Sequence, residues 1–329
     1  MYKVLIVGCG KIAGYFSNRD LDKERSRHAW VFKSHEYFQV AGCVDVDLVR
    51  AKRFSDTVGA PYSGDNVGDA VTSLHPDVVV VATPDETHFE VVCEALQQRD
   101  VRPRIVFLEK PVCTEQNQLE QLLRISDETG VPILVNQSRR FDPAYHELRA
   151  QVRKGELGEL VQVDAVYYGG WRHNAVHWVD IIRYVTDLEF RDFEILETID
   201  DGRLADPTLT VRGNLGGDKE IPVWFHGWDE RIYQIFDLEL RFSKGRLRIG
   251  NFENDISWEK AQVNSLGEIV LQQQALESWR NEPSPLSNAV AGMYHYLQTG
   301  ETKQIRHCLL PEIAPSMRTI WTVGKIRDT

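Results

Sequence analysis

The sequence predicts an α/β protein with a doubly wound, mostly parallel sheet in its N-terminal part and a large, mostly antiparallel open sheet with helices in its C-terminal part. Over residues 1–140, short apolar runs alternate with helical stretches, which indicates a parallel sheet with both faces covered. Beyond residue 158, apolar and polar side chains alternate with a period of two, as in antiparallel strands. The 329 residues suit two domains of about 150 residues each. We expect these domains at residues 1–137 and 138–329.

The N-terminal strands are predicted from apolar runs that end in glycine, proline or a polar residue. These runs lie at residues 3–8, 38–45, 76–84, 104–111 and 131–137. Two of the helices between them are expected at residues 88–98 and 114–130. The second of these is predicted to begin at the cap Thr114 and to end at Gly130.

The C-terminal part is expected to begin with a helix within residues 141–158 and to continue as strands. The strands are predicted at residues 160–168, 208–215, 220–228, 233–250, 255–264 and 268–274, with a hairpin turn at 243–245. Helical stretches at 285–300 and 310–328 follow. One face of this sheet has no obvious covering helix, and an exposed apolar sheet face usually marks an interface. We therefore expect a homodimer or homotetramer that assembles through the C-terminal sheet.

The composition excludes several classes of partner and location. The net charge of −11, from 38 basic and 49 acidic residues, argues against nucleic acid and against an anionic membrane surface. The longest apolar runs are too short to cross a bilayer, and the first residues lack the pattern of a secretory signal. The five cysteines are scattered and contain no C-x-x-C pair. We therefore expect a cytoplasmic protein without a disulfide framework.

A glycine-rich segment, GCGKIAG at residues 8–14, follows the first strand and fits the pattern G-x-G-x-x-A. Gly8 permits a tight turn, Gly10 lets backbone amides approach a pyrophosphate, and Ala13 permits close packing of helix on sheet. The pyrophosphate is expected at the N-terminal end of the following helix, where unpaired amides and the helix dipole favour an anion. The alternative is a glycine turn that binds nothing.

Asp45, at the end of the second strand, is the predicted ligand of the adenosine ribose. A carboxylate at this place binds both ribose hydroxyls and repels a 2′-phosphate, so NAD is favoured over NADP. The first arginine after Asp45 is Arg50. The alternative role for Asp45 is to cap the helix that begins near residue 48, which Asp47 could also do.

Polar residues follow the third and fourth strands, in ATPDETH (82–88) and EKP (109–111). Ligands of open α/β sheets bind at the carboxyl ends of the strands, which is where these residues lie. Lys110 comes directly after a buried run, so we expect partial desolvation that lowers its pKa and suits it to proton transfer. The alternative is a solvated lysine at a strand end.

The segment RHNAVHWVDII, residues 172–182, places His173, His177 and Asp180 on one face if it forms a helix. This spacing suits a metal site, a proton relay, or a helix with a polar edge. A metal needs three or four ligands, and Asp180 lies two helical turns from His173. We therefore favour a proton-transfer site that binds substrate and predict no metal.

Together these motifs resemble those of the Gfo/Idh/MocA oxidoreductases, which include glucose–fructose oxidoreductase and inositol dehydrogenases. The resemblance rests, in chain order, on GCGKIA, Asp45, ATPDETH, EKP, RRFDP (139–143), GELG (155–158) and HNAVHWVDIIRYV (173–185). It implies an N-terminal Rossmann domain, a C-terminal open-sheet α/β domain, and reversible hydride transfer at a sugar or cyclitol hydroxyl.

The resemblance also implies that Lys110 is catalytic and that His177 works beside it. Many relatives carry an aspartate four residues before this histidine, where the present chain has His173 followed by Asn174. Three alternatives follow: the relay runs through His173, Asn174 binds the substrate at this place, or the relay is absent.

The site residues expected from these arguments form three groups. The catalytic candidates are Lys110, His177 and His173. The cofactor-binding candidates are Gly8, Gly10, Lys11, Ile12, Ala13, Asp45, Thr83, Pro84, His88, Glu109 and Lys110. The substrate-binding candidates are Lys110, Asn136, Arg140, Trp171, His173, Asn174 and His177. A core position for Trp171 and a surface position for Arg140 are the alternatives for these two residues.

The function expected from these features is an NAD(P)-dependent dehydrogenase or reductase that acts on CH–OH groups of a polyhydroxylated substrate. One alternative is an enzyme that holds NAD tightly and uses it for transient redox, as in glycoside cleavage or redox between two substrates. The other is a non-catalytic NAD-binding sensor. Release of NADH separates the first two, and any turnover excludes the third.

Overall fold

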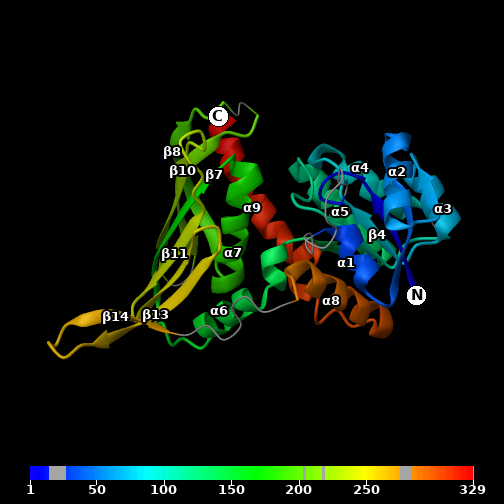
Figure 1. Ribbon diagram of the computed structural model, residues 1–329. Helices are drawn as coiled ribbons and strands as arrows, with labels where there is room; N and C mark the ends of the chain where they lie inside the picture. Colours follow the sequence, from blue (N-terminus) through cyan, green and yellow to red (C-terminus); the bar gives the residue numbers. More distant parts are fainter. Residues whose placement is uncertain (15–26, 99, 203–204, 217–218, 275–282, 329) are drawn as a thin grey trace. The chain divides into compact units, whose positions relative to one another are not determined.

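The protein is described by a computed structural model that covers residues 1–14, 27–98, 100–202, 205–216, 219–274 and 283–328. It forms two compact units (Figure 1). The first unit comprises Met1–Phe141 and Glu282–Ala314, and the second comprises Asp142–Asn281 and Pro315–Thr329. A segment from the last third of the chain thus belongs to the first unit. The predicted division of the chain at residue 137 places this segment in the second domain.

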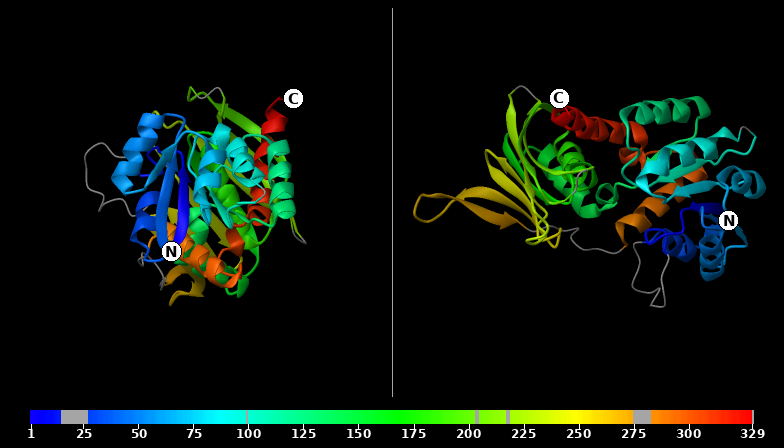
Figure 2. Two further views of the ribbon diagram at one scale, coloured as in Figure 1. Left: turned by 90° about the vertical axis from the view of Figure 1, so that its right-hand side faces the viewer. Right: turned by 90° about the horizontal axis from the view of Figure 1, so that it is seen from above.

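The first unit contains a six-stranded parallel sheet in the order β3-β2-β1-β4-β5-β6, flanked by helices (Figures 1 and 2). This is the strand order of a doubly wound Rossmann domain, whose switch point lies between β1 and β4. The predicted parallel sheet is therefore confirmed. The strands are β1 (Tyr2–Val7), β2 (Phe38–Val44), β3 (Tyr62–Gly64), β4 (Val78–Val81), β5 (Ile105–Leu108) and β6 (Ile133–Val135).

Apolar burial on both faces of the sheet and capped helix ends explain why these residues form these elements. Every residue of β4 and β5 is buried, as expected of central parallel strands. The Asp47 side chain caps the helix α2 by accepting hydrogen bonds from the backbone amides of Val49 and Arg50. The helices of the unit are α1 (His28–Ser34), α2 (Leu48–Val58), α3 (Val67–Leu74), α4 (His88–Gln97), α5 (Gln116–Thr129) and α8 (Pro285–Thr299). The cap of α5 is Glu115, one residue later than the predicted Thr114.

The second unit contains an eight-stranded sheet in the order β14-β13-β12-β11-β7-β10-β9-β8 (Figure 1). Only the pair β7 and β10 is parallel, so the predicted, mostly antiparallel sheet is confirmed. Its strands are β7 (Leu160–Tyr168), β8 (Glu189–Ile199), β9 (Thr208–Gly216), β10 (Ile221–Trp228), β11 (Asp237–Phe242), β12 (Gly245–Gly250), β13 (Asp255–Val263) and β14 (Ile269–Gln274). The helix α6 (Pro143–Arg153) precedes the sheet, and α7 (Val176–Thr186) and α9 (Leu310–Asp328) lie beside it (Figure 1).

One strand of this sheet, β8, does not follow from the sequence pattern. Its pairing with β9 shifts register twice, between Arg191 and Glu194 and between Ile195 and Glu197. Asp192 has a positive φ of 53° within it. Such bulges move side chains out of strict alternation, so the apolar residues of β8 no longer recur with a period of two.

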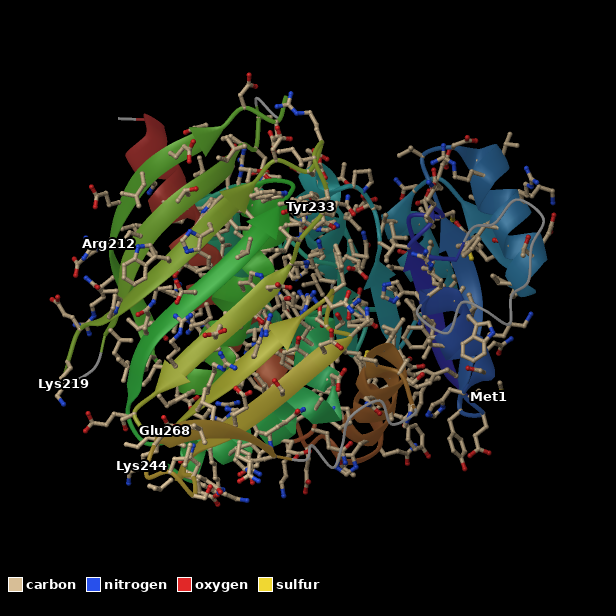
Figure 3. The ribbon with its side chains drawn as sticks, turned by 60° about the vertical axis from the view of Figure 1, so that its left-hand side comes forward. Met1, Arg212, Lys219, Tyr233, Lys244 and Glu268 are labelled. Atoms are coloured by element: carbon tan, nitrogen blue, oxygen red, sulfur yellow. The ribbon has the colours of Figure 1, made fainter. Side chains whose placement is uncertain are left out.

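The sheet face opposite α7 is charged, which corrects the expectation of an exposed apolar face (Figure 3). On β12, Arg246 Nε lies 2.5 Å from Glu259 Oε2 on β13. On β11, Arg241 Nη2 lies 2.7 Å from Glu239 Oε1 and also pairs with Asp164 on β7. Arg246 Nη1 also lies 3.7 Å from Glu239 Oε2, so the ion pairs connect the four neighbouring strands β13, β12, β11 and β7, and long polar side chains cover these strands without a helix. None of the helices in the described part of the chain is long and apolar enough to cross a membrane.

Candidate active site

The glycine-rich segment forms a tight turn at the end of β1. Gly8 has a φ of 90°, and a Cβ placed on it would lie 2.5 Å from the carbonyl oxygen of Ala82, so only glycine fits. A Cβ on Gly10 would meet nothing within 4 Å, which leaves open space above the turn. Ala13 is fully buried, whereas Lys11 and Ile12 are exposed. The predicted following helix falls mostly on residues 15–26, which lie outside the described residues.

Asp45 is held next to this turn by backbone amides. Its Oδ2 accepts a hydrogen bond of 2.9 Å from the Cys9 amide, and its Oδ1 accepts one of 2.9 Å from the Asp47 amide. Because Asp47 caps α2, the capping role considered for Asp45 does not apply. Arg50 Nη1 lies 3.6 Å from Asp45 Oδ1, so one cation stands beside the carboxylate.

Thr83, Pro84 and His88 follow β4 at its carboxyl end. Pro84 is exposed, and Thr83 Oγ1 is a buried polar atom without a hydrogen-bond partner among the described residues. His88 is fully buried; its Nδ1 lies 2.7 Å from the Pro111 carbonyl oxygen and its Nε2 lies 3.0 Å from the Thr83 carbonyl oxygen. This geometry favours a role for His88 in tying the segment after β4 to the segment after β5.

Lys110 follows β5, with a carboxylate and an amide behind it. The buried Glu109 accepts hydrogen bonds at Oε1 from Asn136 Nδ2 at 2.8 Å and from His28 Nε2 at 2.6 Å. The backbone amide of Lys110 lies 3.3 Å from Glu109 Oε2. Asn136 Oδ1 is buried and has no partner in the part of the chain that is described. Three neighbouring strand ends, β4, β5 and β6, thus place polar groups at one edge of the sheet.

The local charges adjust the protonation of Lys110 and Glu109. Burial lowers the pKa of Lys110, while Glu109 and Asp85 act in the opposite direction and Arg139 adds to the lowering. Burial by itself would raise the pKa of Glu109, but the hydrogen bonds and charges of its neighbours, His28 first, bring it below its ordinary value. The desolvation predicted for Lys110 is therefore present, and a lowered pKa makes the neutral amine, which can accept a proton, easier to reach.

Two predicted substrate-binding residues occupy structural positions. Trp171 is buried, donates from Nε1 to the carbonyl oxygen of Ile320 at 3.1 Å and packs edge-on against Phe225. Arg140 is also buried, not at the surface, and donates from Nη1 to the carbonyl oxygen of His307 at 2.7 Å. The geometry favours a core role for Trp171 and a bridging role for Arg140 within the first unit.

The segment RHNAVHWVDII is helical, but it is not one regular α-helix. Residues Trp171–Ala175 form a π-helical turn, and α7 begins only at Val176. His173 lies in the turn and is exposed, whereas His177 lies in the first turn of α7 and is half-buried. Asp180 is buried and accepts a hydrogen bond from Ser316 Oγ at 2.9 Å, a structural role. Within the described ranges, no group of three or more His, Cys, Asp or Glu side chains could hold a metal ion.

Asp206 is a site residue that the sequence argument missed. Its Oδ1 accepts from the Arg172 amide at 2.8 Å and its Oδ2 from the His173 amide at 2.9 Å, so its carboxylate caps the turn that carries His173. Asn174 donates from Nδ2 to the Tyr168 carbonyl oxygen at 2.8 Å. A carboxylate is thus supplied to this turn from a distant loop, and no local spacing in the sequence indicates it.

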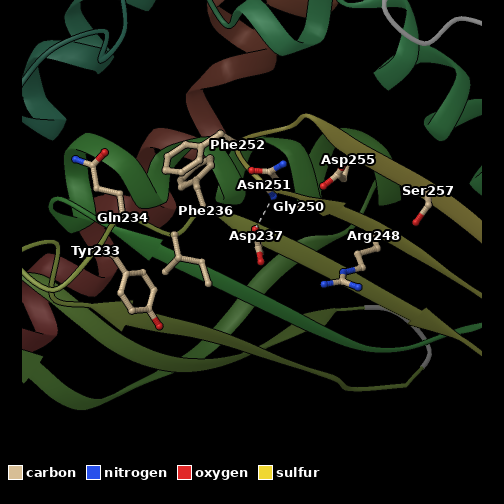
Figure 4. Close-up of a pocket in the computed structure, with 11 residues that line it drawn as sticks. Tyr233, Gln234, Phe236, Asp237, Arg248, Gly250, Asn251, Phe252, Asp255 and Ser257 are labelled. Carbon is tan, nitrogen blue, oxygen red and sulfur yellow. Dashed lines mark hydrogen bonds between the residues drawn. The ribbon is translucent and has the colours of Figure 1, made fainter.

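A polar pocket of about 530 Å³ lies in the second unit, between the segment before β11 and the end of β12 (Figure 4). Its lining combines aromatic rings with charged and amide side chains, among them Tyr233, Phe252, Asp237, Arg248 and Asp255. Asp237 Oδ1 accepts a hydrogen bond of 3.0 Å from the Asn251 amide, drawn dashed in Figure 4. Residues 251–253 all have positive φ, a conformation that costs energy in residues other than glycine.

The aromatic residue Phe236 links this pocket to α7. It lines the pocket, and its ring stacks on Trp178 at a centroid distance of 4.2 Å. The same ring lies edge-on to His177, with centroids 6.2 Å apart. His177 is therefore held against an aromatic wall whose other members are Phe252 and Tyr168.

Residues 2–137 match the model of a protein family described as oxidoreductase family, NAD-binding Rossmann fold (GFO_IDH_MocA). The match covers the Rossmann sheet of the first unit. The Gfo/Idh/MocA resemblance seen in the motifs is thereby confirmed for this domain.

Comparisons with individual proteins reach beyond residue 137. An inositol 2-dehydrogenase of Mycolicibacterium smegmatis is 31% identical over 140 residues, which is 39% of this chain and 39% of that protein. Inositol 2-dehydrogenase 1 of Mycolicibacterium vanbaalenii is 27% identical over 228 residues, 64% of this chain and 65% of that protein. The chain thus spans less than two thirds of the length of these relatives. The crystal structure of a dehydrogenase from Chromobacterium violaceum has a TM-score of 0.76 at 19% identity, over 99% of this chain and 95% of that one, and so shares the fold.

The residues present fit a nicotinamide dinucleotide. Gly8 allows a turn that no other residue could form, and the space above Gly10 is open. Thr83 Oγ1 and Asn136 Oδ1 are buried polar atoms that a ligand could satisfy, since nothing in the described chain bonds to them. Gly8 and Gly10 would hold the pyrophosphate, and Asp45 the ribose.

Proposed function

We propose that this chain is an NAD(P)-dependent oxidoreductase that transfers hydride between the nicotinamide and a hydroxyl or keto carbon of a sugar, sugar derivative or cyclitol. The observation that carries the proposal is Lys110, a desolvated lysine at the carboxyl edge of a Rossmann sheet that matches the model of a family of NAD-binding oxidoreductases. The relatives named inositol 2-dehydrogenase support a polyhydroxylated substrate.

The chain's own residues would handle the proton in this reaction. The bound dinucleotide supplies the group that accepts or donates hydride. Lys110 Nζ would take the proton of the substrate hydroxyl during oxidation and return it during reduction, for which a lowered pKa suits it. From the resemblance of the motifs, His177 is assigned to assist proton transfer, and His173 and Asn174 are assigned to polar contacts with the substrate.

Turnover with release of reduced cofactor is the test of this function. We expect that at least one compound from a panel of sugars, sugar acids, cyclitols and nucleotide sugars reduces NAD in the presence of the purified protein, followed by absorbance at 340 nm. Product formation without free NADH would favour the alternative of tightly held NAD. The absence of turnover in both directions, with NAD bound, would favour the non-catalytic sensor.

The preference for NAD is a second proposal about this site. Because the Asp45 carboxylate lies beside the turn that would hold the pyrophosphate, NAD(H) should bind at least several-fold more tightly than NADP(H). Asp45→Ser should reduce this preference, measured by quenching of tryptophan fluorescence. Asp47→Ser is the matched control, because serine still caps α2 and the preference should stay. Equal affinities of the original protein for the two cofactors would contradict the proposal.

We also propose that the chain forms a homodimer or homotetramer through the sheet of the second unit. The hairpin of β13 and β14 extends from the sheet (Figures 1 and 2) and exposes large apolar side chains, with Val263 71% and Ile269 78% exposed. Light scattering at micromolar concentration should give the mass of two or four chains. Ile269→Lys should lower this mass, because it places a charge on the apolar hairpin surface that the proposed assembly would bury. A monomer of the original protein would rule out the assembly.

A further inference from the structure

A buried histidine from outside the recognised motifs lies behind Lys110. His28 is the first residue of α1, its side chain is 1% exposed, and it packs edge-on against Phe107 of β5 with centroids 5.2 Å apart. Its Nε2 lies 2.6 Å from Oε1 of Glu109, which is also buried. A contact of this length between buried groups is a charge-assisted hydrogen bond.

The direction of this hydrogen bond follows from the chemistry of its partners. An ionised carboxylate only accepts, so His28 Nε2 carries the proton, whether the ring is neutral or charged. The other ring nitrogen, Nδ1, is buried and has no partner in the described segments. Among the described residues, Glu109 thus has two side-chain donors, His28 and Asn136, and both act on the same oxygen.

Without His28, the carboxylate of Glu109 would be poorly supported. Its remaining donors are Asn136 Nδ2 at 2.8 Å and the longer contact of 3.3 Å from the Lys110 amide. A buried carboxylate that loses its strongest donor takes up a proton more readily, because burial disfavours the charged form. The Glu109 charge acts on Lys110, together with Asp85 and, in the opposite direction, Arg139.

We propose that His28 is a positioning residue whose Nε2–H keeps the Glu109 carboxylate ionised and fixed beside Lys110, so that it acts on proton transfer at Lys110 through Glu109. This inference rests on the proposed function for its catalytic meaning. The hydrogen-bonded pair and its effect on Lys110 are independent of the identity of the substrate.

Two substitutions of His28 separate this role from simple packing. His28→Leu removes the donor, while His28→Gln keeps an N–H group at about the place of Nε2. In His28→Leu we expect Glu109 to take up a proton, so that Lys110 loses a stabilising negative charge and its pKa falls. The acid limb of kcat/KM for alcohol oxidation therefore moves to lower pH. In His28→Gln the limb should stay at its original pH.

A second measurement reads Lys110 directly, without turnover. The rate at which acetic anhydride acetylates Lys110, followed by peptide mass spectrometry across pH, reports the fraction of neutral amine. We expect the midpoint to fall in His28→Leu and to remain in His28→Gln. Glu109→Gln should lower the midpoint to the same extent. The double variant with His28→Leu and Glu109→Gln should have the same midpoint as Glu109→Gln alone, because both changes remove the same charge.

Several outcomes would overturn the inference. If His28→Leu lowers only the melting temperature and leaves the midpoint unchanged, His28 has a packing role alone. If His28→Leu does not fold, Glu109→Gln still decides, since an unchanged midpoint there would contradict the proposal. An inactive protein in which these midpoints shift as expected would refute the proposed function while supporting the role of His28.

Discussion

Lys110→Ala is expected to lower turnover by roughly 100-fold or more while the affinity for NAD stays nearly intact, the effect typical of a lost general acid–base group. The reason is that Lys110 is the desolvated amine at the carboxyl edge of β5, and its pKa is lowered by burial. Its side chain is assigned to the substrate hydroxyl, not to the pyrophosphate. Steady-state kinetics with the best substrate of the panel, and NAD titration by fluorescence, measure the two quantities.

Lys110→Arg is the matched control for charge. It keeps a cation near Glu109, but an arginine does not lose its proton at the pH of catalysis, so it should be as inactive as Lys110→Ala. The rate of substrate oxidation by the original protein should rise as the pH increases through the pKa of Lys110, because the neutral amine is the base. Both variants should lose this limb. A Lys110→Ala protein with more than one tenth of the original turnover would show that another group is the base.

Five of the six strands of the first unit could be predicted because they are short, largely buried apolar runs. Val78–Val81 is an example, since a parallel strand covered on both faces has no polar position. The short strand Tyr62–Gly64 was missed because three residues with mixed polarity carry no periodic signal. The return of Glu282–Ala314 to the first unit was missed because local patterns do not say which sheet a helix covers.

The parts of the site that could be predicted depend on local geometry. Gly8 follows a strand and must turn, and Lys110 follows a buried run and must be desolvated; both properties are visible in neighbouring residues. His28 and Asp206 could not be predicted, because their partners are 81 and 33 residues away in the chain. Their contacts exist only in the folded chain.

The charged face of the second sheet illustrates a different limit. Alternation in β7 and β11 correctly predicted that one face is buried, but it gave no reason to expect cross-strand pairs such as Arg241 with Asp164. Ion pairs of this kind let a sheet face remain in water without a covering helix. The apolar surface lies instead on the hairpin of β13 and β14.

The second large effect is expected at the histidines of the second unit. His177→Ala should lower turnover substantially, but less than Lys110→Ala, because its proposed role is shared with orientation of the substrate. The half-buried ring is held edge-on against Phe236, so it is already oriented before substrate binds. His295→Ala, on α8 of the first unit, is the control and should leave turnover unchanged.

His173→Ala distinguishes the alternatives left open at this position. Its backbone amide is fixed by Asp206, and its exposed side chain belongs to the π-helical turn that precedes α7. A large loss of turnover would show that His173 replaces the aspartate of related enzymes, and a small loss would leave it outside the relay.

A metal site predicts a different result: chelators would abolish activity, and zinc or manganese would restore it. Full activity after exhaustive chelation, together with inactive Lys110→Ala, would establish the proton relay, and chelator-sensitive activity would contradict it.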